Sequence, residues 1–115
     1  MRPEALEEGR RWLDQAREDL RWAELLAREG GYYLACFMAQ QVAEKAVKGF
    51  LYSRGADMVT THSVERLLGM AAQHDEAFGN VPDAWASLDA YYVPTRYPNA
   101  LPGGIPARVL SLIHI

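Results

Sequence analysis

The chain has 115 residues, of which 50% are hydrophobic and 23% charged, and its formal net charge is −3. This length suits one small domain, and the composition is too apolar for an intrinsically disordered protein. The mild acidity excludes a strongly basic nucleic-acid binder but leaves room for a local basic patch. A single cysteine, Cys36, excludes an intrachain disulfide and a cysteine-rich zinc site and favours a cytoplasmic location. We see no secretory signal and no apolar stretch long enough to span a membrane.

A first helix is predicted over Pro3–Glu29, ended by Gly30-Gly31. Its apolar residues recur on one side of the helix, as expected for a surface helix that buries a stripe. This stripe consists of Leu6, Leu13, Ala16, Leu20, Ala23 and Ala27. Gly9 weakens the helix interior and predicts a frayed start. Trp22 and Leu25 lie off the stripe, which fits either contact with a second neighbouring helix or an oligomer interface.

A second helix is predicted over Tyr32–Ser53, mostly buried but with one narrow polar stripe. The stripe contains Gln40, Gln41, Glu44, Lys45 and Lys48, which fall within an arc of about 140° at helical spacing. Two interpretations remain open. In the structural one, the stripe is a solvated or interhelical face with a weak Glu44–Lys48 pair. In the functional one, the lysines bind phosphate and the glutamines bond to bases or to a partner helix.

A third helix is predicted to start at His62-Ser63, with Ser63 as an N-cap rather than as a nucleophile beside His62. A loop over 74–80 and a fourth helix from Pro82 to about Tyr92 follow. The inner face of this fourth helix is predicted to carry Val81, Trp85, Leu88 and Tyr92. No segment alternates with period two, so the fold class is all-α.

After Val93, closely spaced prolines predict an extended loop. The helices are therefore expected to be followed by a proline-rich loop near the C-terminus. Four residues at this end, Tyr91, Tyr92, Arg96 and Tyr97, either stack on bases or belong to the core. The sequence contains no His-Glu-x-x-His or Cys-x-x-Cys motif, so no metal site is expected, and no cofactor is predicted either.

Four motifs resemble the prokaryotic HEPN domain family. They are Trp12-Leu13-x-x-Ala16-x-x-Asp19-Leu20-x-x-Ala23, Ala35-Cys36-Phe37-x-Ala39-Gln40-Gln41-x-Ala43-Glu44-Lys45-Ala46-x-Lys48, His62-Ser63-x-x-x-Leu67-Leu68 and Tyr92-x-x-Thr95-Arg96-Tyr97-Pro98. The last one is similar to the Arg-Tyr-Pro motif of one subfamily. The resemblance implies an up-and-down helical bundle, here of four to five helices with the proline-rich loop near the C-terminus, that usually forms a homodimer or higher homo-oligomer. It also implies that the protein binds a nucleotide or RNA and is often encoded beside a minimal nucleotidyltransferase as a toxin–antitoxin pair. A single HEPN-like domain over residues 1–115 is expected.

Many HEPN proteins are metal-independent RNases with an Arg, four to six intervening residues and a His. Arg96 is followed at that range by Leu101, Pro102 and Gly103, which supply no histidine. Arg108 and His114 have the spacing but lie in residues 107–115, interpreted as an atypical or truncated last helix. The function expected is therefore a nucleotide-binding or nucleotidyltransferase-partner module, with enzymatic activity not expected. The candidate ligand-binding residues are Gln41, Glu44, Lys45, Lys48, Arg96 and Tyr97. The alternative is an RNase toxin that uses Arg96, His62 and His114.

Overall fold

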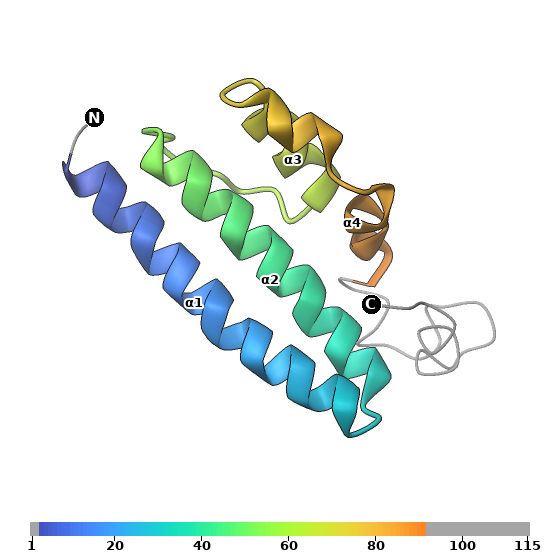
Figure 1. The fold of residues 1–115 in the computed structure, drawn as a ribbon. Coiled ribbons are helices and arrows are strands. Elements are labelled where there is room, and N and C mark those ends of the chain that lie inside the picture. Colours follow the sequence, from blue (N-terminus) through green and yellow to red (C-terminus); the bar gives the residue numbers. More distant parts are fainter. Residues whose placement is uncertain (1–2, 92–115) are drawn as a thin grey trace.

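The structure is a computed structural model that describes residues 3–91. Its frame is an antiparallel hairpin of two long helices, α1 (Pro3–Arg28) and α2 (Tyr32–Ser53), shown in Figure 1. The chain reverses at Gly30, whose φ of +86° suits a residue without a Cβ atom, and the Gly31 amide bonds back to Leu26 at 2.8 Å. The bounds predicted for both helices are confirmed to within one residue.

The two helices approach each other closely where glycine faces glycine. A Cβ atom on Gly9 would lie 2.5 Å from the Gly49 carbonyl oxygen, and one on Gly49 would lie 2.9 Å from that of Gly9. Gly9 is buried inside a continuous helix, so the prediction of a frayed start was wrong. Its lack of a side chain allows the backbones to touch, a requirement that the sequence of one helix cannot reveal.

The apolar stripe predicted for α1 is only partly buried. Its alanines Ala16 and Ala23 are 2% and 6% exposed, whereas Leu6, Leu13 and Leu20 are 49%, 37% and 43% exposed. Close packing at the glycines selects the small-residue face of α1 for contact with α2 and turns the leucines to one edge of the hairpin. The predicted stripe is therefore divided into a buried alanine face and an exposed leucine edge.

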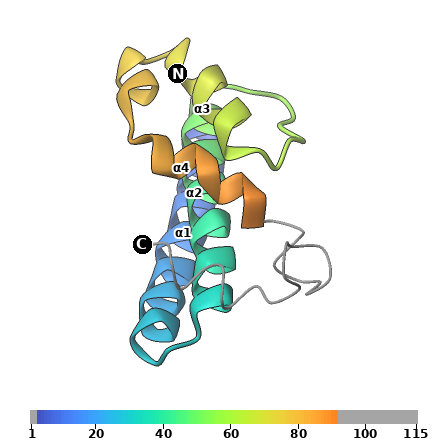
Figure 2. The ribbon, with the colours of Figure 1, turned by 90° about the vertical axis from the view of Figure 1, so that its right-hand side faces the viewer.

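The main core lies on the side of α2 that faces away from α1 (Figures 1 and 2). There α3 (Val64–Ala72) packs its inner face on the C-terminal half of α2, together with Val59 from the connecting segment. The buried cluster consists of Val47, Leu51, Val59, Val64, Leu67, Leu68 and Ala71. Figure 2 shows the lower half of the hairpin extending beyond α3 and α4.

The start of α3 is capped twice. The Ser63 hydroxyl accepts a hydrogen bond from the Arg66 amide at 3.1 Å, which confirms the predicted N-cap. Asp89 adds a second cap from a distant segment, because its carboxylate accepts bonds from the Ser63 hydroxyl and from the Val64 and Glu65 amides. A carboxylate at a helix N-terminus is favoured by both the free amides and the helix dipole.

The segment after α3 differs in detail from the prediction. The predicted loop contains the 3₁₀-helix η1 (Glu76–Asn80), and the predicted fourth helix is divided into α4 (Asp83–Ser87) and the 3₁₀-helix η2 (Leu88–Tyr91). Trp85 is 42% exposed rather than on an inner face. The tighter η2 turn holds Asp89 against α3, which gives a physical reason for the change of helix type. Tyr92 lies outside the described residues.

Residues 3–91 contain helices and turns and no strand, so the all-α class is confirmed. Within this range, no helix combines the length and apolar character required to cross a membrane. The proline-rich segment and residues 107–115 lie outside the described residues.

Candidate functional site

The polar stripe of α2 forms a buried network on the edge of the hairpin opposite the exposed leucines. Gln40, Glu44 and Lys48 are only 0%, 5% and 4% exposed. The Lys48 ammonium donates to Glu44 Oε2 at 2.8 Å, and the Gln40 amide donates to Glu44 Oε1 at 3.2 Å. Both oxygens of the buried carboxylate are therefore bonded, as a charge inside a protein requires.

The network extends to the segment that leads into α3. Gln40 Nε2 donates to the backbone carbonyl of His62 at 2.9 Å, and the His62 ring Nδ1 lies 3.0 Å from Glu44 Oε2. Gln41 in turn donates to Gln40 Oε1 at 2.8 Å. Because a carboxylate can only accept, this contact favours the tautomer of His62 that carries its proton on Nδ1.

An aromatic ring of α1 covers Lys48. Its ammonium lies 5.6 Å from the centre of the Trp12 ring, within the range of a cation–π contact. Trp12 is stacked on Tyr52 with 5.5 Å between ring centres, and its indole N–H donates to Glu8 at 3.1 Å. Lys48 is thus neutralised by Glu44 and enclosed by Trp12, which makes it part of the interior rather than a surface cation.

A second ion pair joins the helices next to this network. Lys45 Nζ lies 2.5 Å from Asp19 Oδ2, while Gln15 donates to the other carboxylate oxygen at 3.0 Å. The side chain of Lys45 is 24% exposed and that of Asp19 is 10% exposed. Arg11, Trp12, Gln15 and Lys45 line a shallow hollow of about 220 Å³. This hollow brings two cationic side chains and an aromatic ring to one surface.

The structure brings together four of the candidate ligand-binding residues, Gln41, Glu44, Lys45 and Lys48, and adds His62 to them. It places Glu44 and Lys48 inside and Lys45 at the surface. Arg96, Tyr97 and His114 lie outside the described residues. Lys45 pairs with Asp19 of α1, and the Glu44–Lys48 pair is buried. Both observations agree with the interpretation of the stripe as an interhelical face. The interpretation as a solvated face was wrong for the buried residues.

The contribution of α1 to this site was missed from the sequence. Asp19, Gln15 and Trp12 hold or surround the two lysines. Trp12 and Asp19 belong to a motif that resembles the HEPN family, whereas Gln15 does not. One signal was present in the sequence, because Asp19 lies three residues after Ala16 and four before Ala23, on the small-residue side of α1. In the structure Asp19 is 7% exposed. A buried acid on an amphipathic helix indicates that a cation comes from a neighbouring element.

Two other reactive groups contribute little to the site. Burial raises the pKa of the Cys36 thiol to about 11, so the group remains protonated at neutral pH and is a poor nucleophile. Burial, and then the neighbouring Cys36, also raise the pKa of Tyr91, which is 6% exposed. For Tyr91 the core interpretation is therefore confirmed.

Comparisons with known proteins agree with the helical architecture. The family model described as HEPN domain matches residues 10–108. Among solved structures, the crystal structure of TT1696 from Thermus thermophilus is similar, with 39% sequence identity and a TM-score of 0.70. That match covers 90% of this chain and 80% of the other. No curated protein matches the chain.

Proposed function

Because this chain belongs to the HEPN family, we propose that it is a dimeric, non-catalytic helical module that binds a nucleotide. In this proposal it acts beside a minimal nucleotidyltransferase in a toxin–antitoxin type system. The observation that supports nucleotide binding is the hollow at the edge of α1 and α2, where Lys45 and Arg11 accompany the Trp12 ring. A phosphate fits the cations, and a base fits an aromatic wall.

A phosphate ligand would compete with Asp19 for the ammonium group of Lys45. Its ammonium is paired with Asp19 but retains 24% exposure, so a phosphate oxygen can approach it from solvent. A ligand cannot reach Lys48 in this way, because its side chain is 5% exposed and its ammonium is paired with Glu44. We therefore assign phosphate contact to Lys45. For Arg96 and Tyr97, ligand contact stays a prediction from the sequence.

Calorimetric titration of the full chain with ATP and GTP tests this assignment. The Lys45→Ala variant is expected to bind about tenfold more weakly, since it loses one charge-assisted contact. Asp19→Asn should act in the opposite direction and strengthen binding, because it removes the anion that competes for the same ammonium. Arg66→Ala, which removes an equal charge from an exposed site on α3, is the matched control. Absence of binding by the unaltered chain at millimolar nucleotide would contradict the proposal.

The nucleotidyltransferase partner is supported by family membership alone. Co-expression with a nucleotidyltransferase encoded beside this gene should yield a complex that contains both chains. Separate elution of the two proteins at micromolar concentration would remove this part of the proposal and leave the nucleotide site unaffected.

A second candidate function, metal-independent RNA cleavage, is favoured by the Glu44–His62 contact. A histidine whose Nδ1 proton is held by a carboxylate presents Nε2 as a base, here on a side chain that is 53% exposed. In this reaction a ribose 2′-hydroxyl would lose its proton to the base and attack the adjacent phosphorus, and the 5′-oxygen would leave with a proton. Arg96 would hold the phosphate, with His114 as the other candidate base.

Incubation of the full chain with RNA in the presence of a metal chelator separates the two functions. An RNase should leave cyclic phosphate ends, and His62→Ala should lower the cleavage rate by about 10²–10⁴-fold. Glu44→Gln should lower it less, since an amide still orients the ring. Cleavage that persists in both His62→Ala and His114→Ala would exclude these residues, and no cleavage by the unaltered chain would exclude the function.

A further inference from the structure

The edge of α1 opposite the polar network carries an uncovered row of leucines. Leu6, Leu13 and Leu20 recur every seven residues, so they lie on one line along the helix, and each is more than a third exposed. The neighbouring alanines and Gly9 are buried against α2. A leucine row of this length favours contact with another apolar surface, because removing apolar area from water stabilises association.

The charges beside this leucine row change sign along the helix. On its outward side the N-terminal half carries Glu7 and Asp14, whereas the C-terminal half carries Arg21 and Arg28, and all four are exposed. A parallel copy of α1 would place like charges together. An antiparallel copy places the acidic half of each helix against the basic half of the other.

We propose that two copies of this chain pair through this edge, with α1 antiparallel to α1 about a two-fold axis near residue 17. This inference rests on the dimer in the proposed function and adds its face and direction. A two-fold axis there sets Leu13 opposite Leu20 of the second copy and Leu6 opposite its Ala27. The facing pairs of opposite charge are Glu7 with Arg28, Asp14 with Arg21, and Arg10 with Glu24. Arg17, which falls near the axis, is already paired with Asp14 of its own helix at 3.6 Å.

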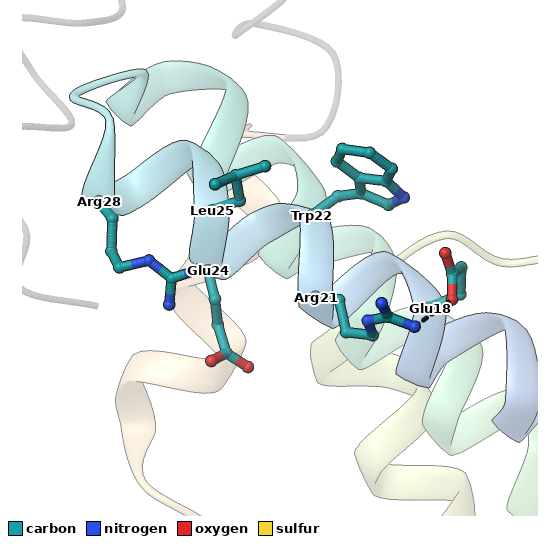
Figure 3. Close-up of a pocket in the computed structure, with 6 residues that line it drawn as sticks. All are labelled: Glu18, Arg21, Trp22, Glu24, Leu25 and Arg28. Carbon is teal, nitrogen blue, oxygen red and sulfur yellow. Dashed lines mark hydrogen bonds and ion pairs between the residues drawn. The ribbon is translucent and has the colours of Figure 1, made fainter.

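This arrangement explains why the leucines lie at an edge rather than inside. Asp19 and Lys45 lie on the opposite edge of the hairpin, so the pairing leaves both copies of the polar network facing outward. Figure 3 shows Trp22 and Leu25 beside a shallow hollow of about 290 Å³, which is lined by Glu18 and by Arg21, Glu24 and Arg28 of the proposed interface. Because Leu25 borders the interface, the control is Met70 of α3, which is 39% exposed.

The first test compares two apolar residues with similar exposed fractions. Leu13 is 37% exposed and Met70 of α3 is 39% exposed, and only Leu13 lies in the proposed interface. Sedimentation of the unaltered 12.9 kDa chain should give twice that mass. Leu13→Glu should weaken the dimer at least a hundredfold and give the monomer mass at about 10 μM, while its circular dichroism remains helical. Met70→Glu should remain a dimer.

The second test establishes direction. Mixing the single variants Leu13→Cys and Leu20→Cys under oxidising conditions should give a covalent dimer that contains one of each chain. Each variant alone should not cross-link, because positions 13 and 20 are about 10.5 Å apart along a helix and a disulfide requires Cα atoms within about 7 Å. Cross-linking of each variant with itself would indicate a parallel pair.

The outcomes separate the inference from the proposal on which it rests. A monomer mass for the unaltered chain at 100 μM would contradict both the dimer and its face. A dimer that resists Leu13→Glu, or that dissociates with Met70→Glu, would overturn the face while leaving dimerisation intact. Neither result bears on nucleotide binding, which is measured separately.

Discussion

Replacing Lys48 with alanine is expected to lower the free energy of unfolding by about 3 kcal/mol, measured by urea denaturation. The substitution removes the ammonium that lies 2.8 Å from Glu44 and leaves that carboxylate, 7% exposed, with Gln40 and His62 as partners. It also empties the space against the Trp12 ring. A small domain is stable by only about 5–15 kcal/mol, so this loss is a large fraction of the total.

Two further variants identify the cause of that loss. Arg11→Ala breaks an exposed pair with Glu8 and should change the stability by no more than about 0.5 kcal/mol. The double variant Glu44→Leu with Lys48→Met should recover more than half of the loss, because it removes the unpaired charge as well as its partner. If Lys48→Ala is as mild as Arg11→Ala, then the Glu44–Lys48 pair does not behave as a buried one.

Replacing Gly9 with alanine is expected to destabilise the protein by about 2 kcal/mol, even though alanine favours a helix over glycine by about 1 kcal/mol. The new methyl group would meet the Gly49 carbonyl oxygen at 2.5 Å and the Ser53 Cβ atom at 2.7 Å. These are backbone and near-backbone atoms, so relief requires the two helices to separate. Thermal or urea unfolding measures the effect.

Gly69 is the matched control, since it also lies inside a helix, and a Cβ atom there has no atom within 4 Å. Gly69→Ala should stabilise the protein by about 0.5–1 kcal/mol through helix propensity alone. The same substitution is thus expected to have opposite signs at two helical positions. Stabilisation by Gly9→Ala would contradict the close approach of α1 and α2.

Local sequence signals were sufficient for the elements whose ends are fixed by local chemistry. Gly30-Gly31 ended α1, and Ser63 began α3, because a left-handed turn and an N-cap depend on the residue itself. The side of α1 that faces α2 was not predictable in this way. The leucines dominate the hydrophobic pattern of α1, but the contact of Gly9 with Gly49 decides which face packs, and that contact exists only in three dimensions.

The candidate site shows the same division. Helical spacing placed Gln40, Glu44, Lys45 and Lys48 on one stripe, and the structure joins them in one network. Spacing could not assign Lys45 to the surface and Lys48 to the interior, because that difference comes from Asp19 and Trp12 on another helix. Contacts between residues of different helices depend on the three-dimensional structure and cannot be derived from the spacing within one helix.

The cap that Asp89 provides for α3 has a consequence for the order of folding. The α1–α2 hairpin is joined by a short turn, so its contacts close a small loop and can form early. The cap on the first amides of α3 comes instead from Asp89, which lies 25 residues after Val64 in the sequence. These amides therefore lack this cap until Asp89 has been synthesised. We therefore expect the hairpin to form first during synthesis and the α3 region to become stable only after residue 89 has been added.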